Sequence, residues 1–99
     1  MQKKDMEAIV TLQLKQVQRR LEDRSIHLEW NRDVAAYLAE KGYDPLYGAR
    51  PLKRLIQNEV VNMLSAAILQ GTILPHQTIC LEKKGDEGLH YKSVSQKIN

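Results

Sequence analysis

The first part of the chain carries apolar residues at intervals of three and four. They recur from Met6 through Leu14 to Leu21, and this spacing places side chains on one face of an α-helix. Asp5 stands just before the apolar stripe and can cap the helix. Charged and amide side chains fill most of the other positions up to Arg24, so we expect that face to meet solvent rather than nucleic acid.

The apolar period then changes to two. Ile26, Leu28 and Trp30 alternate with polar residues, which predicts a short strand. Asn31 is a suitable N-cap for a second helix of about three turns. We expect this helix to end at Gly42, because glycine readily adopts the left-handed conformation that follows many helices.

A third helix is expected from about Ala49 to Gln70, with Gly71 ending it. It is the longest element that the pattern predicts. Its apolar stripe again follows intervals of three and four, and comprises Leu52, Leu55, Ile56, Val60, Met63, Leu64, Ala67 and Ile68. Packing alone requires this spacing, so the stripe predicts a core face and no cofactor site.

The last third of the chain has the features of two strands joined by a hairpin. After a connector at residues 72–77, Ile79 and Leu81 alternate with polar neighbours; a polar, glycine-bearing hairpin at 83–88 then leads to a strand at 89–94. The order α-β-α-α-β-β predicts an α+β fold, with three helices packed on a small three-stranded sheet. We expect one domain at residues 1–94 and a disordered tail at 95–99.

Composition limits the functions that this fold can have. A chain of 99 residues supports one modest core, and without phenylalanine and with a single tryptophan that core must be mostly aliphatic. The net charge of +3 is too weak by itself to indicate nucleic acid or an anionic membrane. The N-terminus has no signal-peptide pattern, and the apolar run at 60–69 is too short to span a bilayer.

Residues that often carry chemistry are scattered. Cys80 cannot form an internal disulfide alone, and its strand position suits a small buried side chain in a reducing compartment. His27, His76 and His90 are far apart without other ligands at metal-binding spacing, so no metal site is expected. No phosphate-cradling glycine loop, nucleophile triad or acid pair is recognisable. We therefore expect no catalysis from this chain alone.

The segment from Gly42 to Arg54 is the most distinctive part of the chain. It combines two glycines and prolines with three cations, in the order Gly-Tyr-Asp-Pro-Leu-Tyr-Gly-Ala-Arg-Pro-Leu-Lys-Arg. Pro51 suits the first position of a helix. The backbone N–H groups at that helix end, together with Arg50, predict an anion site, because a guanidinium can donate two parallel bonds to a phosphate.

From Gly42 to Gln57 the sequence resembles the region around the sensor-2 arginine of Clp-type AAA+ protein-remodelling ATPases. It is most similar to the second ATPase module of ClpB-like disaggregases, and the resemblance implies that the chain is the C-terminal small domain of such a module. Arg50 would then contact the phosphates of ATP, which a large domain absent from this chain would bind. Gly48 and Ala49 would place the helix end near the nucleotide, and Ile9 and Val10 would line the adenine side of the cleft.

The resemblance also implies cofactors and partners. ATP or ADP with magnesium is expected in the full-length protein, and none on the isolated chain. Expected partners are the large AAA+ domain, a neighbouring subunit in a hexameric ring, and unfolded or aggregated polypeptide in the stress response, with no nucleic acid or membrane. The location would be the cytoplasm or the matrix of an organelle of bacterial descent.

Two alternatives remain open from the sequence. One is the small domain of a protease-linked Clp unfoldase, because the segments that distinguish it from a disaggregase lie elsewhere. The other is a free-standing nucleic-acid-binding domain, suggested by the small sheet, the charge of +3 and the basic cluster at residues 50–54. Against the latter, no exposed aromatic pair of an RNA-reading motif is expected on the strands.

Overall fold

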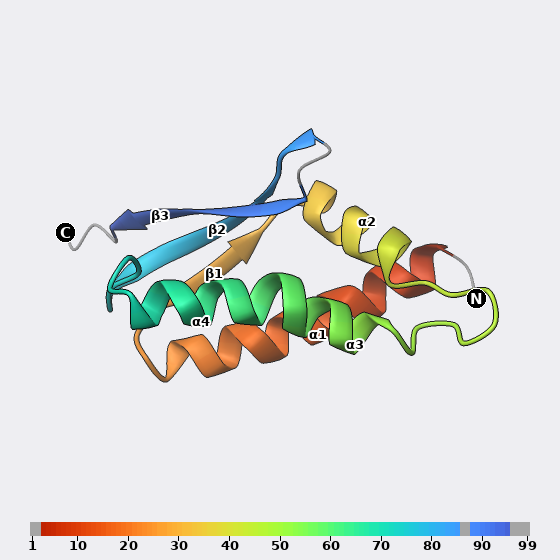
Figure 1. Cartoon of the computed structure of the whole chain (residues 1–99), viewed down its shortest axis with the longest axis horizontal. Helices are drawn as coiled ribbons and strands as arrows, with labels where there is room; N and C mark the ends of the chain where they lie inside the picture. The colour runs from red at the N-terminus through yellow and green to blue at the C-terminus, as the bar shows by residue number, and fades with distance from the viewer. Residues whose placement is uncertain (1–2, 86–87, 96–99) are drawn as a thin grey trace.

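The computed structural model of the chain describes residues 3–85 and 88–95. Its elements are α1 (Lys3–Glu22), β1 (His27–Trp30), α2 (Arg32–Lys41), α3 (Leu52–Ile56), η1 (Gln57–Val61), α4 (Asn62–Leu69), β2 (Gln77–Lys83) and β3 (Leu89–Ser95). The segments α3, η1 and α4 follow one another without a break and form a single long helix (Figure 1). The predicted α+β fold, with three helices and a three-stranded sheet in the order α-β-α-α-β-β, is therefore confirmed.

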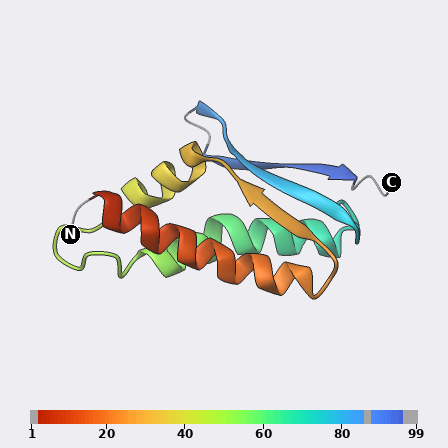
Figure 2. The ribbon, with the colours of Figure 1, turned by 180° about the vertical axis from the view of Figure 1, so that it is seen from behind.

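The sheet has the order β1-β2-β3, so β2 is the central strand. β1 and β2 are parallel, with Leu28 opposite Ile79, whereas β2 and β3 form an antiparallel hairpin with Leu81 opposite Tyr91. A parallel pair needs a long crossover, which α2 and the long third helix supply. The helices pack on one face of the sheet (Figure 1, Figure 2).

The core lies between this sheet face and the helices. Its largest fully buried side chains are all aliphatic, as the composition predicted: Leu14, Leu28, Leu38, Leu52, Leu64, Ile79, Leu81, Val10, Val34 and Val60. No polar or charged residue of the described ranges is buried. The hydrophobic effect therefore supplies most of the stabilisation, and the polar side chains lie at the edges of the core or on the surface.

The third helix departs from the prediction at two points. It begins at Leu52, three residues later than expected, so Arg50 lies in the preceding turn. Its middle, η1, is a π-helical turn in which the Asn62 N–H donates to the Gln57 carbonyl. Leu52, Ile56, Val60 and Leu64 are all buried at intervals of four. In a regular α-helix each step of four residues turns slightly more than one full turn, so after three steps the last side chain points about a third of a turn away from the first. A π-turn contains more residues per turn, so it reduces this rotation and helps to keep the four side chains on one face.

Helix ends follow the predicted chemistry at Asn31 and at Gly71, which follows the C-cap Gln70 with φ +78°, and not at Asp5 and Gly42. Asn31 accepts a hydrogen bond from the Val34 N–H at 3.0 Å, which confirms it as the N-cap of α2. α1 already includes Lys3, so Asp5 lies inside its first turn and is not its cap. Gly42 has φ −87°, so the expected left-handed conformation is wrong there. Glycine is needed at this position because a Cβ would lie 2.6 Å from a Leu52 methyl carbon.

β2 and β3 are somewhat longer than predicted, whereas β1 begins one residue later, at His27. Gln77, assigned to the connector, begins β2, and Ser95, assigned to the tail, ends β3. The hairpin tip at 86–87 and the rest of the expected tail, 96–99, lie outside the described residues. Cys80 is only half-buried, on the sheet face that carries Glu29, so the prediction of a buried cysteine is wrong. Partial burial and the Glu29 carboxylate raise the pKa of its thiol.

Candidate functional site

Residues 42–51, which we call the arginine loop, connect α2 to α3 and are braced by their own backbone. Asp44 and Gly48 exchange two backbone hydrogen bonds, of 2.8 and 2.7 Å. The Asp44 carboxylate also accepts from the N–H groups of Leu46, at 2.7 Å, and Tyr47, at 3.0 Å. Gly48 has φ +64°, which glycine adopts without strain. The loop is therefore a defined turn that needs little burial to hold its shape.

Arg50 leaves this turn just before α3 and is exposed to solvent. Its guanidinium carbon lies 5.3 Å from the centre of the Tyr47 ring, within the range of a cation–π contact. Among residues 3–85 and 88–95 no carboxylate forms an ion pair with Arg50. The side chain is held at the surface by an aromatic ring and keeps its donors for another group.

The surface beside Arg50 is a shallow depression of about 730 Å³. Its lining contains three cations and no carboxylate, and comprises Tyr47, Arg50, Pro51, Lys53, Arg54, Gln57 and Asn58. Arginine and lysine are the side chains that bind phosphates. The residues present therefore fit a phosphate group, since several donors converge without an acid to compete for them.

The arginine loop also exposes a group of large apolar side chains. Leu46 is 78% exposed, Tyr47 56% and Tyr43 41%. The loop that carries them lies at one end of the long axis of the molecule and projects beyond the helices (Figure 1). Exposed apolar groups gathered beside a charged site are typical of surfaces that another protein domain covers.

The remaining predicted site residues lie on or near the core. Ala49 and Ile9 are half-buried and pack against it, and Val10 is fully buried. Any contact of α1 with a ligand would therefore fall to Ile9 rather than to Val10, and the roles of both residues stay predictions. Gly48 is the turn residue already described, and a Cβ there would meet no atom within 4 Å.

Sequence reasoning missed two residues that organise this site. Asp44 braces the loop through its carboxylate, and Tyr47 lies against Arg50. The signal for the first was present, because aspartate followed by proline is typical of the opening of a turn in which the carboxylate accepts backbone N–H groups. Tyr47 stands three residues before Arg50, but spacing in an irregular loop does not predict contact.

The described part of the chain lacks two further kinds of feature. It contains no group of three or more histidine, cysteine, aspartate or glutamate side chains placed to hold a metal ion. None of its helices combines the length and the apolar character needed to cross a membrane.

A three-helix layer on one face of a mixed three-stranded sheet, with an exposed arginine in the turn before the long helix, agrees with the small domain of a Clp-type AAA+ ATPase that the resemblance of residues 42–57 implies. Comparison with known proteins specifies it further. The family model of the C-terminal, D2-small domain of ClpB protein matches residues 1–81. This chain therefore belongs to the family of ClpB D2-small domains.

Curated relatives agree with this family over nearly the whole chain. Chaperone protein ClpB of Chlamydia pneumoniae is 47% identical over 92 residues, which are 93% of this chain and 10% of that protein. Chaperone protein ClpB of Brucella suis biovar 1 is 43% identical over 95 residues, 96% of this chain and 11% of that protein. Chaperone protein ClpB 1 of Thermosynechococcus vestitus is 41% identical over 92 residues. The chain thus spans about a tenth of the length of these relatives.

Proposed function

We propose that this chain is the nucleotide-sensing and subunit-packing small domain of an ATP-dependent ClpB-like disaggregase. The observation that carries the proposal is Arg50, which is exposed, has no carboxylate partner among the described residues, and lies in a loop whose apolar residues Tyr43, Leu46 and Tyr47 are exposed as well. Membership of the ClpB family favours this function over the two alternatives, a protease-linked unfoldase and a free-standing nucleic-acid-binding domain.

In this proposal the arginine loop forms one wall of a nucleotide cleft, and a large AAA+ domain of the full-length protein forms the other. That large domain supplies ATP or ADP with magnesium and the hydrolytic chemistry. Arg50 donates charge-assisted hydrogen bonds to the phosphates, and Lys53 and Arg54 add positive potential. Gly48 and Ala49 set the approach of the loop, while Ile9, supported by Val10, meets the adenine side.

The physical effect of Arg50 is a bias on the position of this domain. A charge-assisted hydrogen bond contributes about 1.5–3 kcal/mol, which corresponds to a factor of about ten or more in the equilibrium between closed and open arrangements. The bond to the terminal phosphate is lost on hydrolysis, so closure weakens. Movement of the small domain is then transmitted to a neighbouring subunit in a hexameric ring.

The wider role follows from the relatives and is also part of the proposal. Their names describe chaperones, so we assign the full-length protein to the rescue of unfolded or aggregated polypeptide in the stress response. We place it in the cytoplasm, because the relatives compared are bacterial and none of them supports the matrix of an organelle. Nucleic acid and membranes are not among the proposed partners.

The test is Arg50→Ala in the full-length protein. We expect a loss of about tenfold or more in ATP turnover or in nucleotide affinity, since one charge-assisted contact is removed. Steady-state ATPase assays and titration with a fluorescent ATP analogue measure the two quantities. Arg19→Ala is the matched control, because Arg19 is exposed on α1 and does not line the depression. Turnover and affinity that are unchanged in Arg50→Ala would contradict the proposal.

A further inference from the structure

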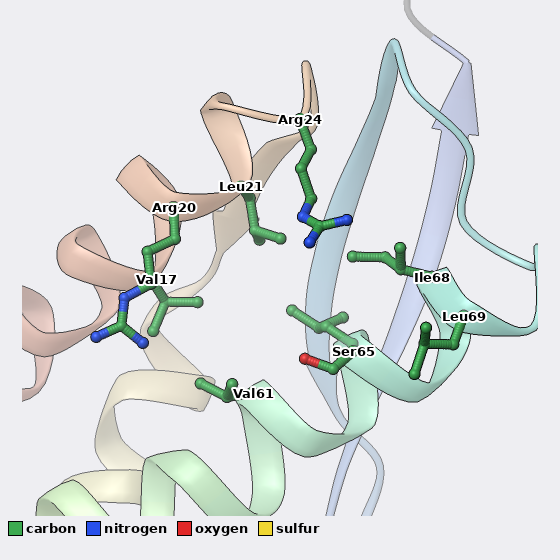
Figure 3. A pocket seen from close by; sticks show the side chains of 9 residues that line it. Val17, Arg20, Leu21, Arg24, Val61, Ser65, Ile68 and Leu69 are labelled. Carbon is green, nitrogen blue, oxygen red and sulfur yellow. The ribbon is translucent and has the colours of Figure 1, made fainter.

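A second open surface lies at the other end of the molecule. α1 and α4 run side by side there and leave a groove of about 370 Å³ between them, far along the long axis from the arginine loop (Figure 1, Figure 3). We call it the α1–α4 groove. Its lining comprises Val17, Arg20, Leu21, Arg24, Val61, Leu64, Ser65, Ile68 and Leu69.

The floor of the groove is apolar and continuous with the core. Val17, Leu21 and Leu64 form its deepest part and are almost fully buried. Toward the outside the apolar lining becomes accessible: Ile68 is half-buried, and Leu69 is 88% exposed, more than any other large apolar residue described. An isolated exposed leucine needs no explanation, but one that continues an apolar groove is typical of a protein interaction site.

Two arginines form the charged edge of the groove. Arg24 extends from the turn that follows α1 toward Ile68, while Arg20 lies beside Val17, and the Ser65 hydroxyl points into the opening between the two helices (Figure 3). Neither arginine has an ion pair within the part of the chain that the structure describes, and the lining contains no carboxylate. The groove therefore combines an apolar floor with positive charge that nothing in its lining neutralises.

We propose that the α1–α4 groove binds an acidic amphipathic helix of another protein. A helix that lies in a groove between two helices inserts apolar side chains spaced three and four apart, and here these would cover Leu69 and Ile68. Carboxylates on either side of that apolar stripe would pair with Arg20 and Arg24. This partner is separate from the nucleotide and from the arginine loop, so the inference does not depend on the proposed function.

Charge and lining argue against other occupants. A second copy of this chain that docked through the exposed face of its own α1 would bring Lys15, Arg19 and Arg20 against the arginines of the groove, and like charges would meet. Single-stranded nucleic acid binds by stacking its bases on aromatic side chains, and the lining contains none. An acidic helix is the occupant that satisfies both the apolar floor and the arginines.

The test is a titration of the ¹⁵N-labelled chain, followed by NMR, with a designed helical peptide that has leucines on one face and glutamates on the flanks. We expect saturable shifts of amide signals from the residues that line the α1–α4 groove, and no comparable shifts in the arginine loop. A peptide with lysine in place of glutamate should bind about tenfold more weakly or not at all, because it meets two arginines.

Variants test whether the arginines and the exposed leucine are responsible. Arg20→Glu with Arg24→Glu should weaken binding of the acidic peptide about tenfold or more, and Leu69→Ala should weaken it at unchanged thermal stability. The matched control is Lys15→Glu with Arg19→Glu, which makes the same change in net charge on α1 outside the lining and should leave affinity within about twofold. Absence of shifts in the groove, equal binding of the lysine peptide, or self-association of the chain that is lost in the Arg20 and Arg24 variant would overturn the proposal.

Discussion

The core and the arginine loop are stabilised in opposite ways. In the core, Leu28, Leu38 and Ile79 have no exposed surface, and their environment is built from helices and strands distant in sequence. In the arginine loop, Leu46 is 78% exposed, and the backbone is held by hydrogen bonds that span only a few residues. The loop thus keeps its conformation without burying its side chains, which leaves them available to a partner domain.

The sharpest test of this contrast exchanges leucine for alanine in each region. Leu38→Ala removes a fully buried side chain from α2 and leaves a cavity, so it should lower the free energy of unfolding by about 2–5 kcal/mol. Leu46→Ala removes the same atoms from an exposed loop position and should change that free energy by less than about 0.5 kcal/mol. Urea denaturation followed by circular dichroism measures both values.

Similar losses in the free energy of unfolding for Leu38→Ala and Leu46→Ala would contradict this contrast between the core and the arginine loop. A large loss from Leu46→Ala would mean that the loop folds back on the domain in solution. In that case the exposed apolar surface beside Arg50 would not be available to a large domain.

Two glycines of the arginine loop, Gly42 and Gly48, provide the second test, with a smaller expected effect. An alanine Cβ at position 42 would lie 2.6 Å from a Leu52 methyl carbon and 2.9 Å from the Leu38 carbonyl oxygen. Gly42→Ala should therefore cost about 1–3 kcal/mol through overpacking. Gly48→Ala meets no neighbour but requires φ +64°, so it should cost about 1 kcal/mol through backbone strain alone.

Thermal denaturation of the two glycine variants gives this ranking directly. The reverse order, with Gly48→Ala the more damaging, would show that the conformation of the loop contributes more than its contact with the core. Gly85→Ala is a useful reference, because it has a positive φ and an open environment outside the loop.

The third test concerns the edge of the core, where Tyr37 and Glu59 form a hydrogen bond. Tyr37 donates a 2.8 Å hydrogen bond to Glu59 Oε1, and the other carboxylate oxygen of Glu59 is buried without a hydrogen-bond partner. Tyr37→Phe should lower the free energy of unfolding by about 1 kcal/mol, because the half-buried Glu59 carboxylate loses its donor. Denaturation at neutral pH measures this difference.

The same pair predicts a dependence on pH. Partial burial, followed by the bond to Glu59, raises the pKa of Tyr37 above its ordinary value of 10.0. A raised pKa means that the folded chain holds this proton more tightly, so the stabilisation is complete below pH 10 and is lost as the pH rises through the raised pKa. Tyr37→Phe should therefore lose less stability than the wild-type chain above about pH 10. Parallel curves for the two proteins would show that Tyr37 does not contribute this stabilisation.

Several parts of the molecule could be predicted because the information is local. Intervals of three and four along α1 and the long helix, and of two along β1, identified the buried faces, and the side chain of Asn31 marked the start of α2. Pro51 placed the beginning of the long helix within a few residues. The resemblance of residues 42–57 to Clp-type ATPases identified the family that the comparison with the ClpB D2-small model then established.

Other features depend on residues that meet only in the folded chain. A period of two predicts a strand but not its neighbours, so the parallel pairing of β1 with β2 required the crossover by the helices. The π-turn at Gln57–Val61 lies in the middle of the long helix, whose buried side chains, four residues apart, all face the same core. Which apolar side chains stay exposed to solvent was likewise decided by the tertiary structure.

The sequence by itself determined which residues are apolar, which faces they share and which turn carries Arg50, because these properties depend on near neighbours along the chain. The tertiary structure decided which apolar faces are covered. It buried Leu38 and left Leu46 in the arginine loop and Leu69 at the end of α4 exposed, since covering a side chain requires a second element and the described residues supply none at these two positions.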